Sequence, residues 1–122
     1  MNTVTLDEDD RYIFGLGFEI AWPFSVDATD ALRNYLIHGL TPGGFLCAMI
    51  AYDYERALYN ADVLHRQKFW LIAMHIRNNM PSGSVGSYDN MRHWLDNKDD
   101  MRTMFIQEVE KRKVWDKLQQ TH

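Results

Sequence analysis

Residues 45–59 read FLCAMIAYDYERALY and lie near the middle of a chain of 122 residues. Apolar side chains fall almost all round a helix drawn through this stretch, a pattern typical of a helix that is buried on most of its surface. Thr41 and Pro42 come just before it, as a capping hydroxyl and a proline suited to the first helical turn. The stretch therefore predicts the central helix of a mostly α fold.

The helical pattern continues through FWLIAM at residues 69–74 and on to about Asn78. An unbroken helix from 44 to 78 would be about 50 Å long, whereas a domain of this size is only about 30–35 Å across. We therefore expect a break or kink near residue 60, where the apolar pattern is interrupted. Seven side chains are expected to be almost fully buried: Phe45, Leu46, Met49, Ile50, Trp70, Ile72 and Ala73.

Shorter helices are predicted on both sides of this centre. Ser25 or Asp27 can cap a helix that Gly39 ends, and Ser87 can cap a short helix that leads to Leu95. A final helix over 98–118 has an apolar stripe made of Met101, Met104, Phe105, Val109, Val114, Trp115 and Leu118. The fold expected for a single domain, 1–122, is a compact bundle of about five helices.

The segment 12–22 follows a two-residue period instead. Its apolar side chains fall on one side of an extended chain: Tyr12, Phe14, Leu16, Phe18, Ile20 and Trp22. Gly15 and Gly17 disfavour a helix, each by about 1 kcal/mol relative to alanine. We expect one N-terminal β-strand or extended arm within 1–24, ahead of a helical core over 25–122.

A lone apolar strand leaves backbone N–H and C=O groups unpaired along both edges. We expect the 12–22 strand to pair antiparallel with the same strand of a second copy, which makes the protein a homo-oligomer, a dimer. If the segment is helical instead, its apolar side chains can pack on their own domain, and the case for this dimer is weaker.

Composition and charge narrow the possible functions. The net charge is −4, which argues against a generic nucleic-acid binder because such proteins are usually basic. The one cysteine, Cys47, cannot form an internal disulfide and is expected to be a small buried hydrophobe. The N-terminal region is acidic, unlike a signal peptide, and no apolar run approaches the ~20 residues of a membrane span. We expect a cytoplasmic protein that does not engage a membrane.

The sequence contains no catalytic or metal-binding motif: it lacks HExxH, and its histidines are not spaced as ligand pairs. The loop with Ser82, Ser84 and Ser87 opens a helix, a geometry that can cradle phosphate, but it lacks the Gly-Lys-Ser/Thr ending of a P-loop. A connector in which Ser87 caps the next helix is the simpler interpretation. We expect no cofactor, no metal and a role in binding rather than catalysis.

The helix after this loop has four candidate contacts for a partner: Tyr88, Arg92, His93 and Trp94. Tyr, Trp and Arg are the residue types that dominate binding hot spots. Trp94 also fits the apolar stripe of its helix, so a structural role is the stronger interpretation for it. The basic and aromatic residues at 65–68, 77 and 92–94 alternatively suit stacking on single-stranded nucleic acid.

Several short motifs between residues 41 and 95 are shared with one known group of proteins. They are Thr41-Pro42-Gly43-Gly44-Phe45-Leu46, Asp53, Ala57, Ala61-Asp62, Pro81, Gly86-Ser87 and Trp94. This pattern resembles that of small uncharacterised accessory proteins of tailed bacteriophages and prophages. The resemblance implies an accessory phage protein in the cytoplasm of a bacterial host, and it transfers no catalytic or binding residue.

The expected function is therefore non-enzymatic. We expect a phage accessory protein that binds a host macromolecule, an unidentified host protein, and in doing so either inhibits a host defence system or redirects host metabolism. Two alternatives stay open. One is a nucleic-acid-binding protein that uses residues 65–77 and 92–94, and the other is a small enzyme or nucleotide-sequestering protein that uses the loop 82–87.

Overall fold

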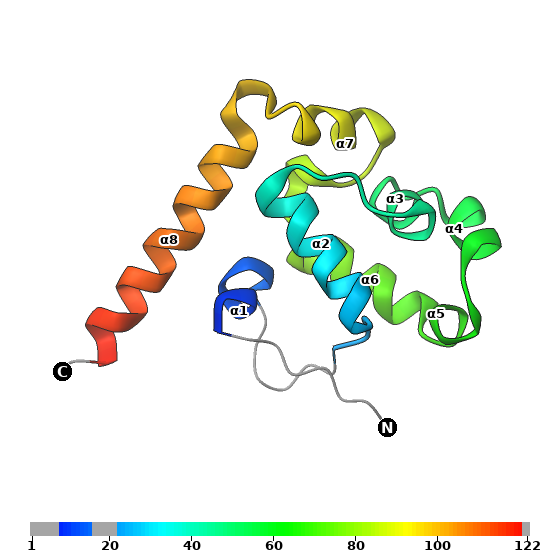
Figure 1. Ribbon diagram of the computed structural model, residues 1–122, viewed down its shortest axis with the longest axis horizontal. Helices are drawn as coiled ribbons and strands as arrows, with labels where there is room; N and C mark the ends of the chain where they lie inside the picture. The colour runs from blue at the N-terminus through cyan, green and yellow to red at the C-terminus, as the bar shows by residue number, and fades with distance from the viewer. Residues whose placement is uncertain (1–7, 16–21, 121–122) are drawn as a thin grey trace.

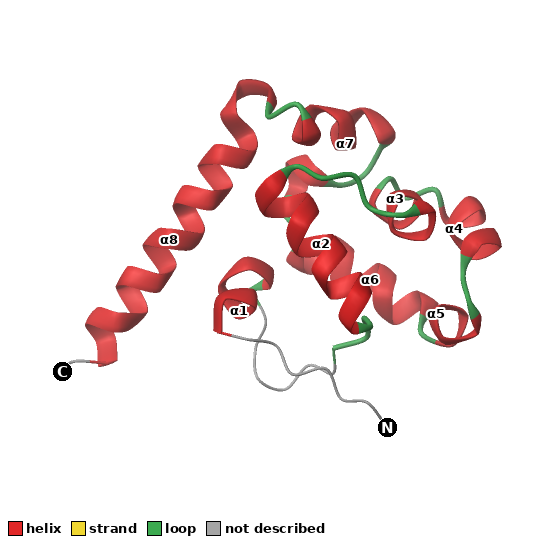
Figure 2. Ribbon diagram, in the orientation of Figure 1, coloured by secondary structure: helices red, strands yellow, loops and turns green. Residues whose placement is uncertain are grey.

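The computed structural model describes residues 8–15 and 22–120, and within these ranges it consists of helices and connecting turns without a strand. The α-helices are α1 (Glu8–Phe14), α2 (Val26–His38), α3 (Gly44–Ile50), α4 (Tyr54–Asn60), α5 (Val63–Gln67), α6 (Phe69–Asn79), α7 (Tyr88–Leu95) and α8 (Met101–Gln120) (Figures 1 and 2). Short 3-10 turns, η1 (Ser82–Ser84) and η2 (Lys98–Asp100), precede α7 and α8. The mostly α fold is confirmed, with more and shorter helices than the expected bundle.

The central stretch breaks in three places, between α3 and α4, between α4 and α5, and at Lys68 between α5 and α6. The expected break near residue 60 is present, where Asp62 accepts a hydrogen bond from the His65 N–H at 2.8 Å and starts α5. A second break, which was not expected, separates α3 from α4 at Tyr52, whose φ is +61°. Asp53 then caps α4 by accepting from the Arg56 N–H at 3.4 Å. Apolar residues flank this second break on both sides, so hydropathy alone reads straight through it.

Burial along the central helices matches most of the predicted core. Leu46, Met49, Ile50, Ile72 and Ala73 are buried as predicted. Phe45 is half-buried and stacks on the His65 ring at 4.5 Å, and Cys47 is half-buried with its thiol donating to the Pro42 carbonyl at 3.1 Å. The prediction for Trp70 is wrong, because its side chain is 71% exposed. Helix α6 buries the face of Phe69, Ile72 and Ile76, and Trp70 lies about 100° round the helix from Phe69.

The N-terminal segment differs from the expected strand where the structure describes it. Residues 12–14 are the end of helix α1, and Phe14 is buried. Trp22 contacts the Phe14 ring at 5.0 Å and donates from its indole N–H to Thr29 Oγ1 at 2.7 Å. Phe14, the last residue of α1, and Trp22, which lies ahead of α2, thus both pack on their own domain.

The remaining members of that predicted apolar face, Leu16, Phe18 and Ile20, lie outside the described residues. Within the described part, α1 is held to the body by charge. Asp10 is buried and accepts from Arg33 of α2 at 2.7 Å. Tyr12 is half-buried, and its backbone carbonyl accepts from Arg112 of α8 at 3.2 Å.

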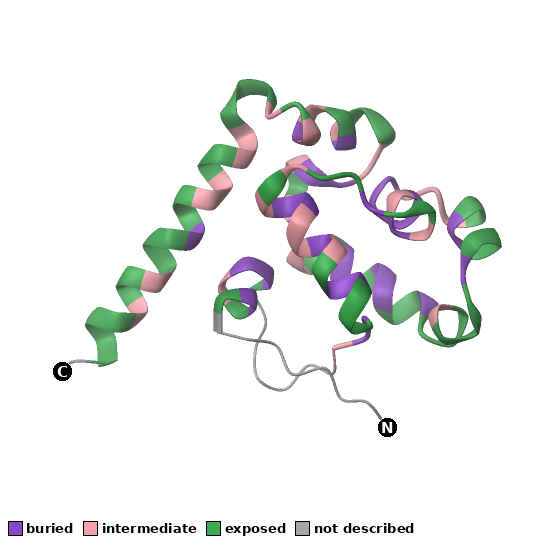
Figure 3. Ribbon diagram, in the orientation of Figure 1, coloured by how far each residue is buried: buried purple, intermediate pink, exposed green. Residues whose placement is uncertain are grey.

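Helix α8 leaves α7 through an elbow in which Asn97, Asp99 and Asp100 all have left-handed backbone, with φ between 53° and 59°. Near this elbow the guanidinium of Arg102 occupies the space that a Cβ at Gly39 would fill, and Gly39 itself has φ +64°. Further along, Val109 is buried and Lys113 pairs with Asp9 of α1 at 3.1 Å. The last turns of α8 extend beyond α1 and are exposed along most of their surface (Figures 1 and 3).

Candidate binding surface

The serine loop before α7 is packed into the body. The Ser84 side chain is buried and donates to the Pro81 carbonyl at 2.6 Å, while its own carbonyl accepts from the Tyr35 hydroxyl at 2.7 Å. Ser87 caps α7 as expected, accepting from the Asn90 N–H at 3.0 Å. Ser82 is exposed. Ser84 and Ser87 therefore have structural partners, and Ser82 alone of the three faces solvent.

The four candidate residues on α7 point in different directions. Trp94 is 2% exposed and donates from its indole N–H to the Tyr35 carbonyl at 3.2 Å, which makes it a core residue. Tyr88 and Arg92 lie one turn apart on the outer side of α7, and both are exposed. His93 is half-exposed and lies about 100° round the helix from Arg92. The structure thus keeps Tyr88 and Arg92 on one side and separates His93 and Trp94 from them.

Tyr88 is joined to the start of α4. Its hydroxyl donates to Asp53 Oδ2 at 2.7 Å, and this hydrogen bond is the main reason that the pKa of Tyr88 is raised. Arg56 pairs with the same carboxylate at 3.6 Å, and its guanidinium lies 5.9 Å from the centre of the Tyr88 ring. Asp53 therefore makes three interactions: it caps α4, accepts a hydrogen bond from Tyr88 and forms an ion pair with Arg56.

A second group of contacts continues from Tyr52 to helix α6. The Arg77 guanidinium lies 4.3 Å from the centre of the Tyr52 ring and donates from Nε to the Tyr54 hydroxyl at 2.5 Å. The Tyr52 and Tyr54 rings stack at 5.9 Å, and Tyr54 meets Trp70 edge-on at 6.1 Å. The left-handed backbone at Tyr52, which costs about 1 kcal/mol or more in a non-glycine residue, lets both tyrosines reach the same arginine.

These two groups form one continuous patch, which we call the Tyr–Arg surface. Its members are Tyr52, Asp53, Tyr54, Arg56, Trp70, Arg77 and Tyr88. They come from the α3–α4 turn and from α4, α6 and α7, so that the whole middle of the chain must fold before the patch exists. Exposed Met74 lies between Trp70 and Arg77 on the same side of α6 and extends the patch.

Sequence reasoning found two members of this surface, Tyr88 as a candidate contact for a partner and Arg77 in the nucleic-acid alternative, and it missed the others. The sequence Tyr52-Asp53-Tyr54 does contain a usable signal, because an aspartate ahead of a helical pattern is a common N-cap and two tyrosines beside it would then lie at a turn. No local pattern connects Tyr54 with Arg77, which lies 23 residues further on. That contact is a product of tertiary packing.

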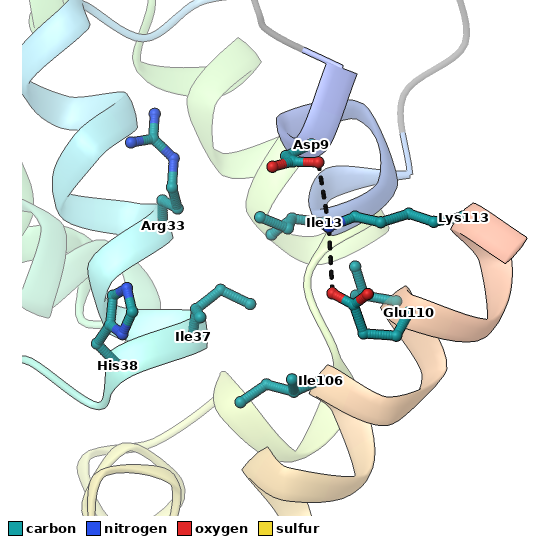
Figure 4. Close-up of a pocket in the computed structure, with 9 residues that line it drawn as sticks. Asp9, Ile13, Arg33, Ile37, His38, Ile106, Glu110 and Lys113 are labelled. Carbon is teal, nitrogen blue, oxygen red and sulfur yellow. Dashed lines mark hydrogen bonds and ion pairs between the residues drawn. The ribbon is translucent and has the colours of Figure 1, made fainter.

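A cavity of about 340 Å³ lies between α1, α2 and α8 (Figure 4). Its apolar lining comes from Ile13, Ile37, Ile106 and Val109. At its edge Lys113 bridges Asp9 and Glu110, at 3.1 and 3.2 Å. Burial would lower the pKa of Lys113, but the hydrogen bonds to the two carboxylates outweigh it and raise the pKa overall. The charges around this cavity are thus already matched by one another, which gives a charged ligand little to bind.

The described ranges hold neither a cluster of metal ligands nor a helix that could span a membrane. Among residues 8–15 and 22–120, no three His, Cys, Asp or Glu side chains come close enough to hold a metal ion together. None of the described helices has both the length and the apolar character needed to cross a bilayer. No protein-family model, no curated protein and no solved structure matches this chain. The Tyr–Arg surface therefore has to be interpreted from its own geometry.

Proposed function

We propose that this protein acts by binding another protein through the Tyr–Arg surface. The observation that carries the proposal is that the side chains of the patch are already held in place. Exposed Arg56, Trp70, Arg77 and Tyr88 and half-buried Tyr52 and Tyr54 are linked by hydrogen bonds and ring contacts. Tyr, Trp and Arg are the residue types that dominate hot spots at protein interfaces. Side chains already fixed in place lose less conformational entropy on association, which favours a tight complex.

The arginines in and beside the surface already have partners within the protein, which favours a protein partner over a nucleic acid. Arg56 pairs with Asp53, Arg77 donates to Tyr54, and Arg92 lies 3.9 Å from Asp89. Nucleic-acid affinity comes mostly from cations that neutralise phosphates, and the chain as a whole has a net charge of −4. Stacking of bases on Trp70 is the feature that keeps nucleic acid as the alternative.

The biological setting that we propose is that of a phage accessory protein in the host cytoplasm. It rests on the resemblance over residues 41–95, the part of the chain that supplies every member of the Tyr–Arg surface. In this setting the partner is a host protein, and a component of a host defence system is the partner that we propose. Binding would block that component without any chemical step.

The binding proposal can be tested by affinity capture from a bacterial extract with the full chain. We expect a host protein that is retained by the unaltered chain and lost with Trp70→Ala and with Arg77→Ala. The matched control is Tyr59→Ala, which removes an exposed aromatic side chain from α4 outside the surface. Melting temperatures within about 5 °C of one another would show that all the variants are folded.

Two results would overturn the proposal. One is retention that is equal for the unaltered chain and for Trp70→Ala, because binding would then not use this surface. The other is capture of nucleic acid with a steep salt dependence, which would replace a protein partner with a phosphate backbone. The defence hypothesis has its own test. Phage plating on a defended host should rise when the unaltered chain is produced and stay low with Trp70→Ala.

A further inference from the structure

The outer side of α8 has a regular pattern that the proposed function does not use. Met104, Glu108, Lys111, Trp115 and Leu118 follow one another at alternating steps of four and three residues, the spacing of a coiled-coil seam. All five are exposed, with Met104 at 62% and Trp115 at 61%. The opposite side of α8 holds Phe105, Val109 and Lys113, which contact the body. We call these five residues the α8 seam.

We propose that the α8 seam pairs with the α8 seam of a second copy, with the two helices antiparallel. The charges of the seam select this arrangement. A parallel, in-register pair would place Glu108 against the partner subunit's Glu108 and set like charges together. An antiparallel pair about a two-fold axis can place Glu108 against the partner subunit's Lys111, and symmetry then repeats the same pair on the other side.

The same register also matches the apolar residues. Met104 comes four residues before Glu108, and Trp115 comes four residues after Lys111. Aligning the two charge pairs therefore brings Met104 against the partner subunit's Trp115, again twice. Beside Trp115 lies a groove of about 310 Å³ lined by Glu110, Lys111, Val114, Trp115 and Leu118. A flexible methionine suits such a groove and makes favourable sulfur–aromatic contacts.

The surroundings of α8 leave room for a second helix. Phe105, Val109 and Lys113 on the other side of α8 contact α7, the core and α1, and Figure 1 shows the rest of the described chain on one side of α8. The two bodies would lie on opposite sides of the helix pair. One helix from each copy makes a small interface, so we expect association in the micromolar range.

The test is the mass of the full chain by sedimentation over a range from low to several hundred micromolar, at low salt. We expect the mass to rise from 14.4 kDa toward twice that value. Glu108→Lys and Lys111→Glu should each weaken association by about tenfold or more, because each sets like charges together at both central positions. The matched control is Lys117→Glu, a charge reversal on α8 that lies off the seam and should leave association unchanged.

Two rescue experiments test whether the two helices pair in the proposed register. The double variant Glu108→Lys/Lys111→Glu should associate again, since both pairs are reversed together. An equimolar mixture of the two single variants should also associate, because each contributes the charge that the other requires. All of these side chains are exposed, so far-UV circular dichroism should stay unchanged. A mass that stays at 14.4 kDa throughout, or association that persists in both single variants, overturns the proposal, as does failure of both rescues.

Discussion

The Tyr–Arg surface and the α8 seam each expose a tryptophan, but the two regions hold it differently. Trp70 lies against Phe69 and Tyr54, with ring centres 5.4 and 6.1 Å away. Trp115 contacts no other ring among the residues that the structure describes, and it stands at the edge of an open groove. The first region is ordered before any partner arrives, which suits recognition of a dissimilar molecule. The second gains order by association, and its charge pattern is complementary to itself.

The largest effect is expected where the two regions are joined. Trp94 lies on α7 with Tyr88 and packs edge-on against Phe105 of α8 at 5.7 Å. Trp94→Ala should lower the free energy of unfolding by about 3–5 kcal/mol, because it leaves a large cavity in the core. Urea unfolding measures this loss. A cost under about 1 kcal/mol would contradict the core role assigned to Trp94.

A smaller loss of stability is expected at alkaline pH, where Tyr35 can ionise. The hydroxyl of Tyr35 holds the loop that positions Tyr88 in the Tyr–Arg surface. Burial is the main cause that raises the pKa of Tyr35, whose hydroxyl binds the loop that leads to Tyr88. Below the ordinary tyrosine pKa of about 10 this hydroxyl is protonated in both states, so the group adds no pH dependence there. Above it the unfolded chain ionises first, and the free energy of unfolding should fall by up to about 1.4 kcal/mol per pH unit.

Unfolding at about pH 9 and about pH 11 measures this fall. Tyr35→Phe should make the fall shallower, although it costs stability at neutral pH by removing the hydrogen bond to Ser84. An equally steep fall in Tyr35→Phe would assign the alkaline sensitivity to other groups. The pKa values of Tyr52, Tyr88 and Cys47 are raised as well, so a shallower fall should remain in Tyr35→Phe.

A third prediction separates two roles of Asp53 in the Tyr–Arg surface, the cap of α4 and the hydrogen bond with Tyr88. Asp53→Ala removes the cap of α4 and the acceptor of Tyr88 together, and it should cost about 1 kcal/mol of unfolding free energy. Tyr88→Phe removes only the hydroxyl and should cost clearly less, because the pair is partly exposed to water. Thermal unfolding of both variants ranks them. If Tyr88→Phe costs as much as Asp53→Ala, the cap is not what Asp53 contributes.

The smallest changes in the free energy of unfolding are expected when either of the two exposed tryptophans, Trp70 or Trp115, is replaced. Trp70→Ala should cost about 0.5–1 kcal/mol, because it removes ring contacts with Phe69 and Tyr54. Trp115→Ala should leave the stability of the dilute monomer unchanged within about 0.5 kcal/mol. At high protein concentration the order should reverse, since only Trp115 lies in the α8 seam. Unfolding curves at two protein concentrations make this comparison.

The sequence predicted the parts of this fold that depend on local pattern. The break near residue 60 and the cap at Ser87 were both predicted, because polar and hydroxyl residues mark them locally. The exposure of Trp70 could not be predicted, since an apolar residue on a helix that is apolar nearly all round looks the same whether it points in or out. The strand expected over 12–22 was wrong for residues 12–14, where a helix ends at Phe14 and Gly15 follows with φ +64°. There a glycine that argues against a helix in fact ends one.

The candidate site shows the same limit. Tyr88 was found because it follows a recognisable loop and cap. The contacts of Arg77 with Tyr52 and Tyr54 depend on how α6 packs beside the α3–α4 turn, and no spacing along the chain encodes that packing. Surface patches built by tertiary contacts between distant segments are the part of this molecule that cannot be predicted from the sequence alone.

The elbow at Asn97, Asp99 and Asp100 has a mechanical consequence. Helix α8 has 20 residues and is about 30 Å long, so it acts as a lever with the elbow as its fulcrum. A rotation of about 10° at the fulcrum would move the far tip by about 5 Å, roughly one helical turn. Three of the four residues from Asn97 to Asp100 have left-handed backbone, which non-glycine residues adopt only at a cost, so the packing around the elbow has to hold them there. The direction of α8, and with it the position at which Trp115 is presented, is therefore set both by this backbone, about 20 Å or more away, and by the contacts of Val109 and Lys113 with the body.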